Sequence, residues 1–207
     1  MTREKVVVFI DYANINRASS DNNYELDYAA LLNYFGEGRF IVDAHCYVPV
    51  DPRNEHRMDK EINSLWDCGY LVNAKVGKIA GDTYKCDFDI EITMDLLQTA
   101  YQVKPDIIVL ASGDVDFIPV ILELRRMGVR VEVASFERSI SNEVIRKASG
   151  FISLDTYCNE CAASDLSDTS NEIPASGVYG NEHGIDRDAL NLNDTEPMLH
   201  DNDLQND

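Results

Sequence analysis

The most constraining feature of this sequence is a regular alternation of short apolar runs with helical segments between residues 5 and 154. Residues 5–10 form a continuous apolar run, which is typical of a strand buried on both faces of a sheet. Repeated strand–helix alternation predicts a parallel sheet with right-handed crossovers and helices on both faces. We therefore expect a three-layer α/β/α, Rossmann-like domain with a central parallel sheet of about five strands. The expected strands are 5–10, 39–48, 70–76, 107–111 and 129–136, with a short last strand at 151–154, and the expected helices are 27–35, 52–68, 87–101, 116–127 and 142–148.

Charge divides the chain into two parts. Residues 156–207 hold 12 acidic residues and one basic residue, whereas residues 1–155 hold 25 acidic and 17 basic residues. The second part is rich in Asn, Asp, Ser and Gly and has few large apolar side chains, so it cannot bury enough surface to offset its ordering entropy. We predict a globular domain over residues 1–155 and an acidic, disordered tail over residues 156–207.

The formal net charge of −19 argues against two classes of partner. A protein that coats nucleic acid needs basic stripes that release counterions, and a protein bound to anionic lipid needs basic clusters. No apolar stretch approaches the ~20 residues of a membrane helix, so we expect no membrane partner.

The five cysteines are scattered and odd in number, which favours reduced thiols and a cytoplasmic location. Cys158 and Cys161 form a CxxC pair, but a structural zinc site needs two further ligands.

Acidic residues follow the predicted strands at the edge where a parallel sheet binds its ligands. If the first and fourth strands are neighbours, the carboxylates that follow them converge. Clustered carboxylates repel one another unless a cation holds them, and hard oxygen ligands suit Mg²⁺ or Mn²⁺. Such a metal can activate a water for attack on a phosphodiester. The acids concerned are Asp11 after the first strand, Asp114 and Asp116 after the fourth, and Asp87, Asp89 and Glu91 at the start of a helix.

Each of these residues also has a structural interpretation. Asp116 and Asp87 are placed to cap the helices that follow them. Asn14 is either a turn residue or a contact for the scissile phosphate. Lys85 is either solvated or a phosphate contact. The agreement of three acidic groups on one edge favours the metal site over these separate interpretations.

Three motifs together resemble the NYN domain family, specifically its LabA-like branch, which is related to the PIN-like nucleases. The resemblance covers roughly residues 4–155, and its motifs are specific in combination although each alone is weak. The motifs are Val-Phe-Ile-Asp-Tyr-Ala-Asn at 8–14, Lys-Cys-Asp-Phe-Asp-Ile at 85–90 and Ser-Gly-Asp-Val-Asp-Phe-Ile-Pro at 112–119.

The resemblance implies a PIN-like α/β/α fold and a metal-dependent ribonuclease with RNA as its substrate. It places the catalytic, metal-binding acids at Asp11, Asp89, Asp114 and Asp116, with Asp87 as an alternate ligand. Asn14 and Lys85 would contact the substrate, and Mg²⁺ or Mn²⁺ would be the cofactor. We assign Asp95 a structural role, because six residues turn a helix by about 600° and point it away from Asp89.

Two alternatives stay open. A non-catalytic regulator of the same fold would bind RNA or a protein partner through the same pocket, and the sequence leaves a homo-oligomer open as well. Other acid-rich classes fit less well. A haloacid-dehalogenase phosphatase needs Asp-x-Asp after the first strand, but position 13 is Ala, and the chain has no GxxxxGK[ST] phosphate loop.

Overall fold

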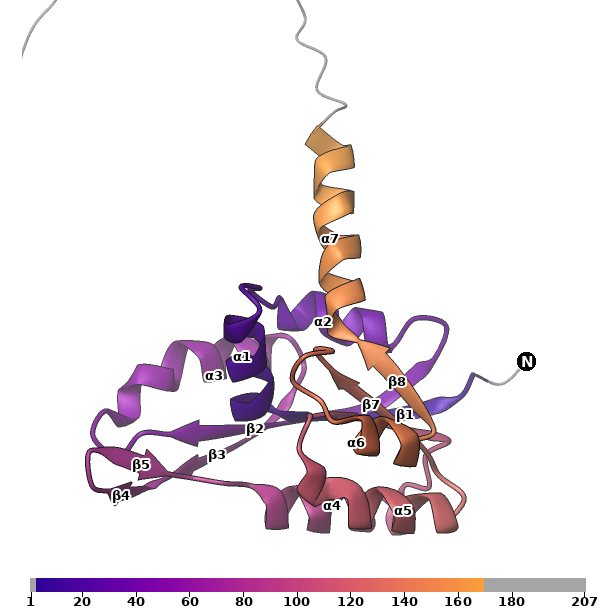
Figure 1. Ribbon diagram of the computed structural model, residues 1–207, viewed down its shortest axis with the longest axis horizontal. Helices are drawn as coiled ribbons and strands as arrows, with labels where there is room; N and C mark the ends of the chain where they lie inside the picture. The colour runs from indigo at the N-terminus through magenta and orange to yellow at the C-terminus, as the bar shows by residue number, and fades with distance from the viewer. Residues whose placement is uncertain (1–2, 170–207) are drawn as a thin grey trace, which may run out of the picture. The chain divides into compact units, whose positions relative to one another are not determined.

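The computed structural model describes residues 3–169 and has a central sheet of six strands, all of whose pairings are parallel (Figure 1). The strand order is β3-β2-β1-β6-β7-β8. The order reverses direction between β1 and β6, which makes this junction the switch point where Rossmann-like sheets bind ligands. The strands are β1 (Lys5–Asp11), β2 (Phe40–Val50), β3 (Leu71–Val76), β6 (Ile107–Ala111), β7 (Arg130–Ser135) and β8 (Gly150–Ser153).

The helices cover both faces of this sheet, as the alternation predicts. Helices α1, α2, α3 and α7 contribute to the hydrophobic cluster on one face, and α4, α5 and α6 contribute to the cluster on the other. Figure 1 shows α1, α2 and α3 on the side opposite α4, α5 and α6. The helices are α1 (Tyr12–Asp21), α2 (Tyr28–Phe35), α3 (Asp59–Asp67), α4 (Asp89–Gln102), α5 (Ile118–Arg126), α6 (Asn142–Lys147) and α7 (Leu154–Thr169).

The central strand β1 explains why a continuous apolar run marks the middle of the sheet. Side chains alternate along a strand, so Val8 and Ile10 join one cluster while Val7 and Phe9 join the other. All four are fully buried. The predicted three-layer α/β/α fold is confirmed, with a sixth strand formed by β8.

Three local features differ from the sequence-based expectation. The segment after β1 is the helix α1, which we did not predict. Residues 77–85, to which we assigned no strand, contain an antiparallel hairpin of β4 (Lys78–Ala80) and β5 (Thr83–Lys85). The helix expected from residue 52 begins later, with the 3-10 turn η1 (Glu55–Met58) leading into α3. The Asp51 carboxylate accepts hydrogen bonds from the backbone N–H and Nε of Arg53, which holds a turn there instead.

Helix α7 crosses the predicted boundary at residue 155. We expected disorder from residue 156, but residues 156–169 continue this helix, and the rest of the predicted tail lies outside the described residues. The first turns of α7 are anchored by apolar packing: Leu154 is fully buried, and the ring of Tyr157 lies 5.0 Å from that of Tyr34. None of the five cysteines forms a disulfide. Among the described helices, none is long and apolar enough to cross a membrane.

Candidate metal centre

Three aspartate side chains converge beyond the carboxyl ends of β1 and β6. Asp89 is the first residue of α4, Asp114 follows β6, and Asp116 lies in the 3-10 turn η2 (Val115–Phe117). One carboxylate oxygen from each lies within 4.8 Å of the other two. Within residues 3–169, this is the one group of three or more His, Cys, Asp or Glu side chains close enough to share an ion. The Cys158–Cys161 pair therefore gains no further ligands in that part of the chain.

The geometry of these carboxylates fits a small, hard cation. Mg²⁺ binds oxygen ligands at about 2.1 Å, so two of its ligands lie at most ~4.2 Å apart. The three carboxylate oxygens lie within 4.8 Å of one another, so a small movement of the side chains would bring them to the ligand separation of Mg²⁺. A set of carboxylates with room for waters is the donor set that Mg²⁺ and Mn²⁺ prefer.

Asp11 lies beside this cluster but is not a member of it. Its Oδ2 accepts a hydrogen bond from the Ser112 hydroxyl at 3.2 Å, and its Oδ1 accepts one from the Asn14 N–H at 3.2 Å. Ser112 Oγ in turn accepts from the backbone N–H of Asp114 at 3.2 Å. The buried Ser112 therefore links Asp11 to the loop that carries Asp114 and Asp116.

Helix capping occurs at this site, but at other residues than expected. Asp11 caps α1 through the Asn14 N–H, and Asp114 caps η2 by accepting from the Asp116 N–H at 2.9 Å. The predicted caps were Asp116 and Asp87, and both assignments are wrong. Helix α4 begins at Asp89, after Phe88, and therefore leaves Asp87 outside its first turn.

Electrostatics at the site disfavour several negative charges without a cation. Burial, opposed by hydrogen bonds from Asn14 and Ser112, raises the pKa of Asp11 to about 6. Burial and the nearby charge of Asp114 also raise the pKa of Asp89. A bound cation would relieve this repulsion.

The remaining predicted residues differ in whether they line the acidic pocket. Asn14 Oδ1 accepts a hydrogen bond from the Gly113 N–H at 2.9 Å, so Asn14 helps to hold the loop after β6. Lys85 is exposed on β5 and does not line the pocket of about 470 Å³ that contains Asp11, Asn14, Asp89 and Asp114. Asp95 accepts a hydrogen bond from the Tyr47 hydroxyl at 2.7 Å, in keeping with a structural role.

The sequence led us to assign no role at this site to two groups. Arg17 lines the acidic pocket from α1, one turn after Asn14, and its place depends on a helix that was not predicted. Ser112 was visible in the Ser-Gly-Asp-x-Asp motif, but its link to Asp11 spans 101 residues. Its position in this motif was the one sequence feature that could have indicated a role for Ser112.

Gly113 sits where no side chain fits. A Cβ added there would lie 2.3 Å from the backbone oxygen of Ser139. We expect Gly113→Ala to displace the loop that carries Asp114, to destabilise the fold by about 1–3 kcal/mol and to weaken Mn²⁺ binding. Urea unfolding and calorimetric titration measure the two effects. Gly150→Ala is the matched control, because its Cβ would meet only the Glu132 side chain, at an ordinary contact distance of 3.4 Å or more. Equal effects of both substitutions would contradict this account.

Lys75, at the end of β3, fixes the segment that leads into α4. Its Nζ donates to the Asp87 carbonyl at 2.6 Å, pairs with Glu91 and lies 4.6 Å from the centre of the Phe88 ring. Asp89 lies between Asp87 and Glu91, so the contacts of Lys75 hold the segment that carries it.

We expect Lys75→Met to cost about 1 kcal/mol of stability, because the lost contacts are largely exposed. The same change should weaken Mn²⁺ binding roughly tenfold through misplacement of Asp89, as outer-shell changes do at other metal sites. Calorimetric titration measures this affinity. Lys78→Met, on the exposed face of the hairpin, is the control. Unchanged affinity in Lys75→Met would remove the positioning role.

The fold and the acidic cluster together define a class of protein, a Rossmann-like α/β/α domain with carboxylates at its switch point. The NYN domain model, which describes a PIN-like nuclease family, matches residues 5–155. The chain belongs to the NYN domain family.

Two further comparisons agree with this membership. The chain is 32% identical over 161 residues to the Low amplitude and bright protein LabA of Synechococcus elongatus, covering 73% of this chain and 84% of that protein. It also resembles the crystal structure of a protein of unknown function from Vibrio parahaemolyticus, with a TM-score of 0.62 and 24% identity. That likeness covers 73% of this chain and 93% of the other, and it bears on the fold alone.

Proposed function

We propose that this protein is a metal-dependent endoribonuclease that hydrolyses RNA phosphodiester bonds. The observation that carries the proposal is the convergence of the Asp89, Asp114 and Asp116 carboxylates at the switch point of an NYN domain. Two of these acids, Asp89 and Asp114, line a pocket whose remaining lining includes Arg17 and Asn14.

Each residue has a distinct role in this proposal. Asp89, Asp114 and Asp116 would hold Mg²⁺ or Mn²⁺, which when bound supplies an activated water and charge stabilisation at the phosphate. Asp11 is the proton acceptor, since a pKa of about 6 suits a general base near neutral pH.

The substrate contacts fall to cationic and amide groups around the acids. Asn14 uses its Oδ1 to hold Gly113, which leaves its Nδ2 as the donor for a phosphate oxygen. Arg17 supplies positive charge from the pocket wall, and Lys85 would contact the RNA farther along the hairpin. In this proposal the metal lowers the negative charge where RNA approaches, and the enzyme acts in the cytoplasm.

The test is cleavage of end-labelled single-stranded RNA by the purified full chain with Mn²⁺, with and without EDTA. We expect internal cleavage that stops when EDTA removes the metal. Cleavage that persists in EDTA would overturn the metal-dependent mechanism. RNA binding without turnover would instead favour a regulatory NYN protein.

A further inference from the structure

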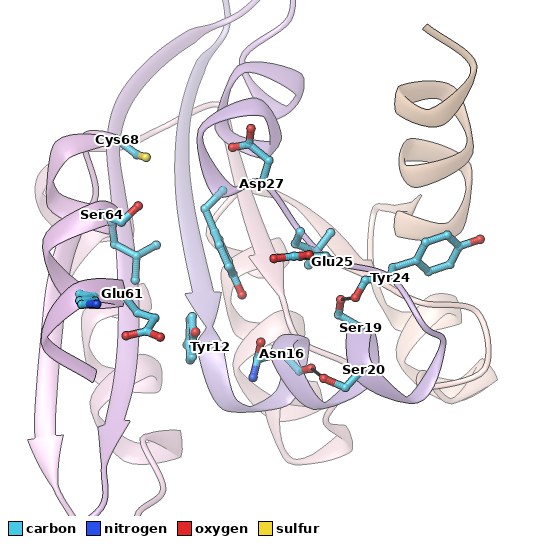
Figure 2. A pocket seen from close by; sticks show the side chains of 14 residues that line it. Tyr12, Asn16, Ser19, Ser20, Tyr24, Glu25, Asp27, Glu61, Ser64 and Cys68 are labelled. Atoms are coloured by element: carbon cyan, nitrogen blue, oxygen red, sulfur yellow. Dashed lines mark hydrogen bonds between the residues drawn. The ribbon is translucent and has the colours of Figure 1, made fainter. Parts of the chain in front are cut away.

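A second pocket, of about 520 Å³, is lined by residues of α1, α2 and α3 and by the segment between α1 and α2 (Figure 2). Its lining includes Tyr12 and Asn16, whereas Ala13 and Arg17 line the acidic pocket. At 100° per residue, these two sets of residues occupy faces of α1 about 100° apart. The two pockets therefore lie against neighbouring faces of α1.

The second pocket combines an aromatic wall with polar side chains that have no hydrogen-bond partner among the described residues. The rings of Tyr12 and Tyr28 stack with centroids 5.5 Å apart. The buried Tyr28 hydroxyl has no hydrogen-bond partner among the described residues, although buried polar groups normally have one. Figure 2 shows Tyr12 between Glu61, from α3, and Asn16, from α1.

The charge of the lining favours a neutral group with N–H donors over a phosphate. Glu25, Asp27 and Glu61 are acidic, and Lys60 is the single basic residue of the lining. Asp27 already caps α2, but the side chains of Glu61 and Asn16 make no hydrogen bond to another described residue. An aromatic ring beside a carboxylate and an amide is the combination with which proteins stack a base and bind its edge.

We propose that this pocket is a nucleobase subsite that holds a guanine next to the phosphate cleaved at the acidic centre. Guanine is the one common RNA base with two adjacent N–H donors on its pairing edge, and the Glu61 carboxylate can accept both. The volume suits a base with its ribose. The identification of the ligand as RNA rests on the proposed ribonuclease function.

The experiment has a binding arm and a cleavage arm. Guanosine and uridine, which carry no phosphate, are titrated into the full chain and followed by NMR. We expect guanosine to bind at least tenfold more tightly than uridine, and Glu61→Gln to reduce this preference to about twofold, because it removes a charge-assisted acceptor. Glu55→Gln, an exposed acid of η1 outside the pocket lining, should keep the wild-type preference.

In the cleavage arm, products from a random single-stranded RNA are sequenced with Mn²⁺. Guanine should be enriched at one fixed position beside the cut, and Glu61→Gln should erase that enrichment. Cleavage without base preference, together with equal binding of the two nucleosides, would overturn the subsite while leaving the ribonuclease intact. Glu61-dependent guanosine binding without any cleavage would support the subsite and count against the ribonuclease.

Discussion

Replacing Asp114 with asparagine is expected to lower Mn²⁺-dependent RNA cleavage by about 10³-fold, equivalent to roughly 4 kcal/mol of transition-state stabilisation. Asparagine keeps the Oδ1 that accepts from the Asp116 N–H, so the cap of η2 survives. The charge that would hold the cation is lost. We therefore expect a folded protein with little activity, as measured by initial rates on labelled RNA and by the urea midpoint.

The matched control is Asp106→Asn. Asp106 precedes β6 as Asp114 follows it, so the same chemical change falls at opposite ends of one strand. Its Oδ2 accepts from the Lys5 backbone N–H at 2.7 Å, a bond that asparagine can retain. Cleavage by Asp106→Asn should stay within about twofold of wild type. If Asp114→Asn also retained wild-type cleavage, the acidic cluster would not be the reaction centre.

Asp11→Asn is expected to change stability and activity in opposite directions. Burial raises the pKa of Asp11 from 3.8 to about 6, so its ionised form destabilises the metal-free fold at neutral pH. The shift corresponds to a cost of up to about 3 kcal/mol, at 1.36 kcal/mol per pKa unit. Loss of the carboxylate should raise the free energy of unfolding and lower cleavage about 10²–10³-fold through loss of the base.

The pH dependence follows from the direction of this shift. Because the folded-state pKa is the higher one, the folded protein binds the proton more tightly, and the cost grows as pH rises from about 4 to about 6. The stabilisation by Asp11→Asn should therefore be largest above pH 6.5 and about half as large at pH 5. Urea unfolding in EDTA at pH 5 and pH 7.5 measures it. A variant less stable than wild type at pH 7.5 would show that the hydrogen bonds from Ser112 and Asn14 outweigh the burial of charge.

The layers of the fold could be predicted because the pattern that indicates them is local. The continuous apolar run of β1 reflects burial on both faces of the sheet. Helix α2 is bounded by its N-cap Asp27 and its C-cap Gly36, which lie within ten residues of each other. The placement of Asp11 near Asp114 was predictable for a related reason: parallel strands end at one edge, and β1 and β6 are neighbours.

The missed features depend on contacts between distant segments or on weak local propensity. Helix α1 has a mostly polar sequence, Tyr-Ala-Asn-Ile-Asn-Arg-Ala-Ser-Ser-Asp, and buries only Ile15, Ala18 and Ser19. The position of Asp89 depends on Lys75, which lies on β3 and pairs with Glu91 of α4. The periodicity of the sequence does not indicate that these two elements are in contact. The sequence alone also could not separate Asp11 from the three-carboxylate cluster, because that distinction arises from its bonds to Ser112 and Asn14.

The central claim is that Asp89, Asp114 and Asp116 share a divalent cation. A crystal structure of the full chain with Mn²⁺, with anomalous scattering recorded to locate the metal, tests it most directly. We predict an anomalous peak within about 2.0–2.3 Å of one oxygen from each of these three carboxylates. A peak elsewhere, or none at a Mn²⁺ concentration that supports cleavage, would contradict the claim.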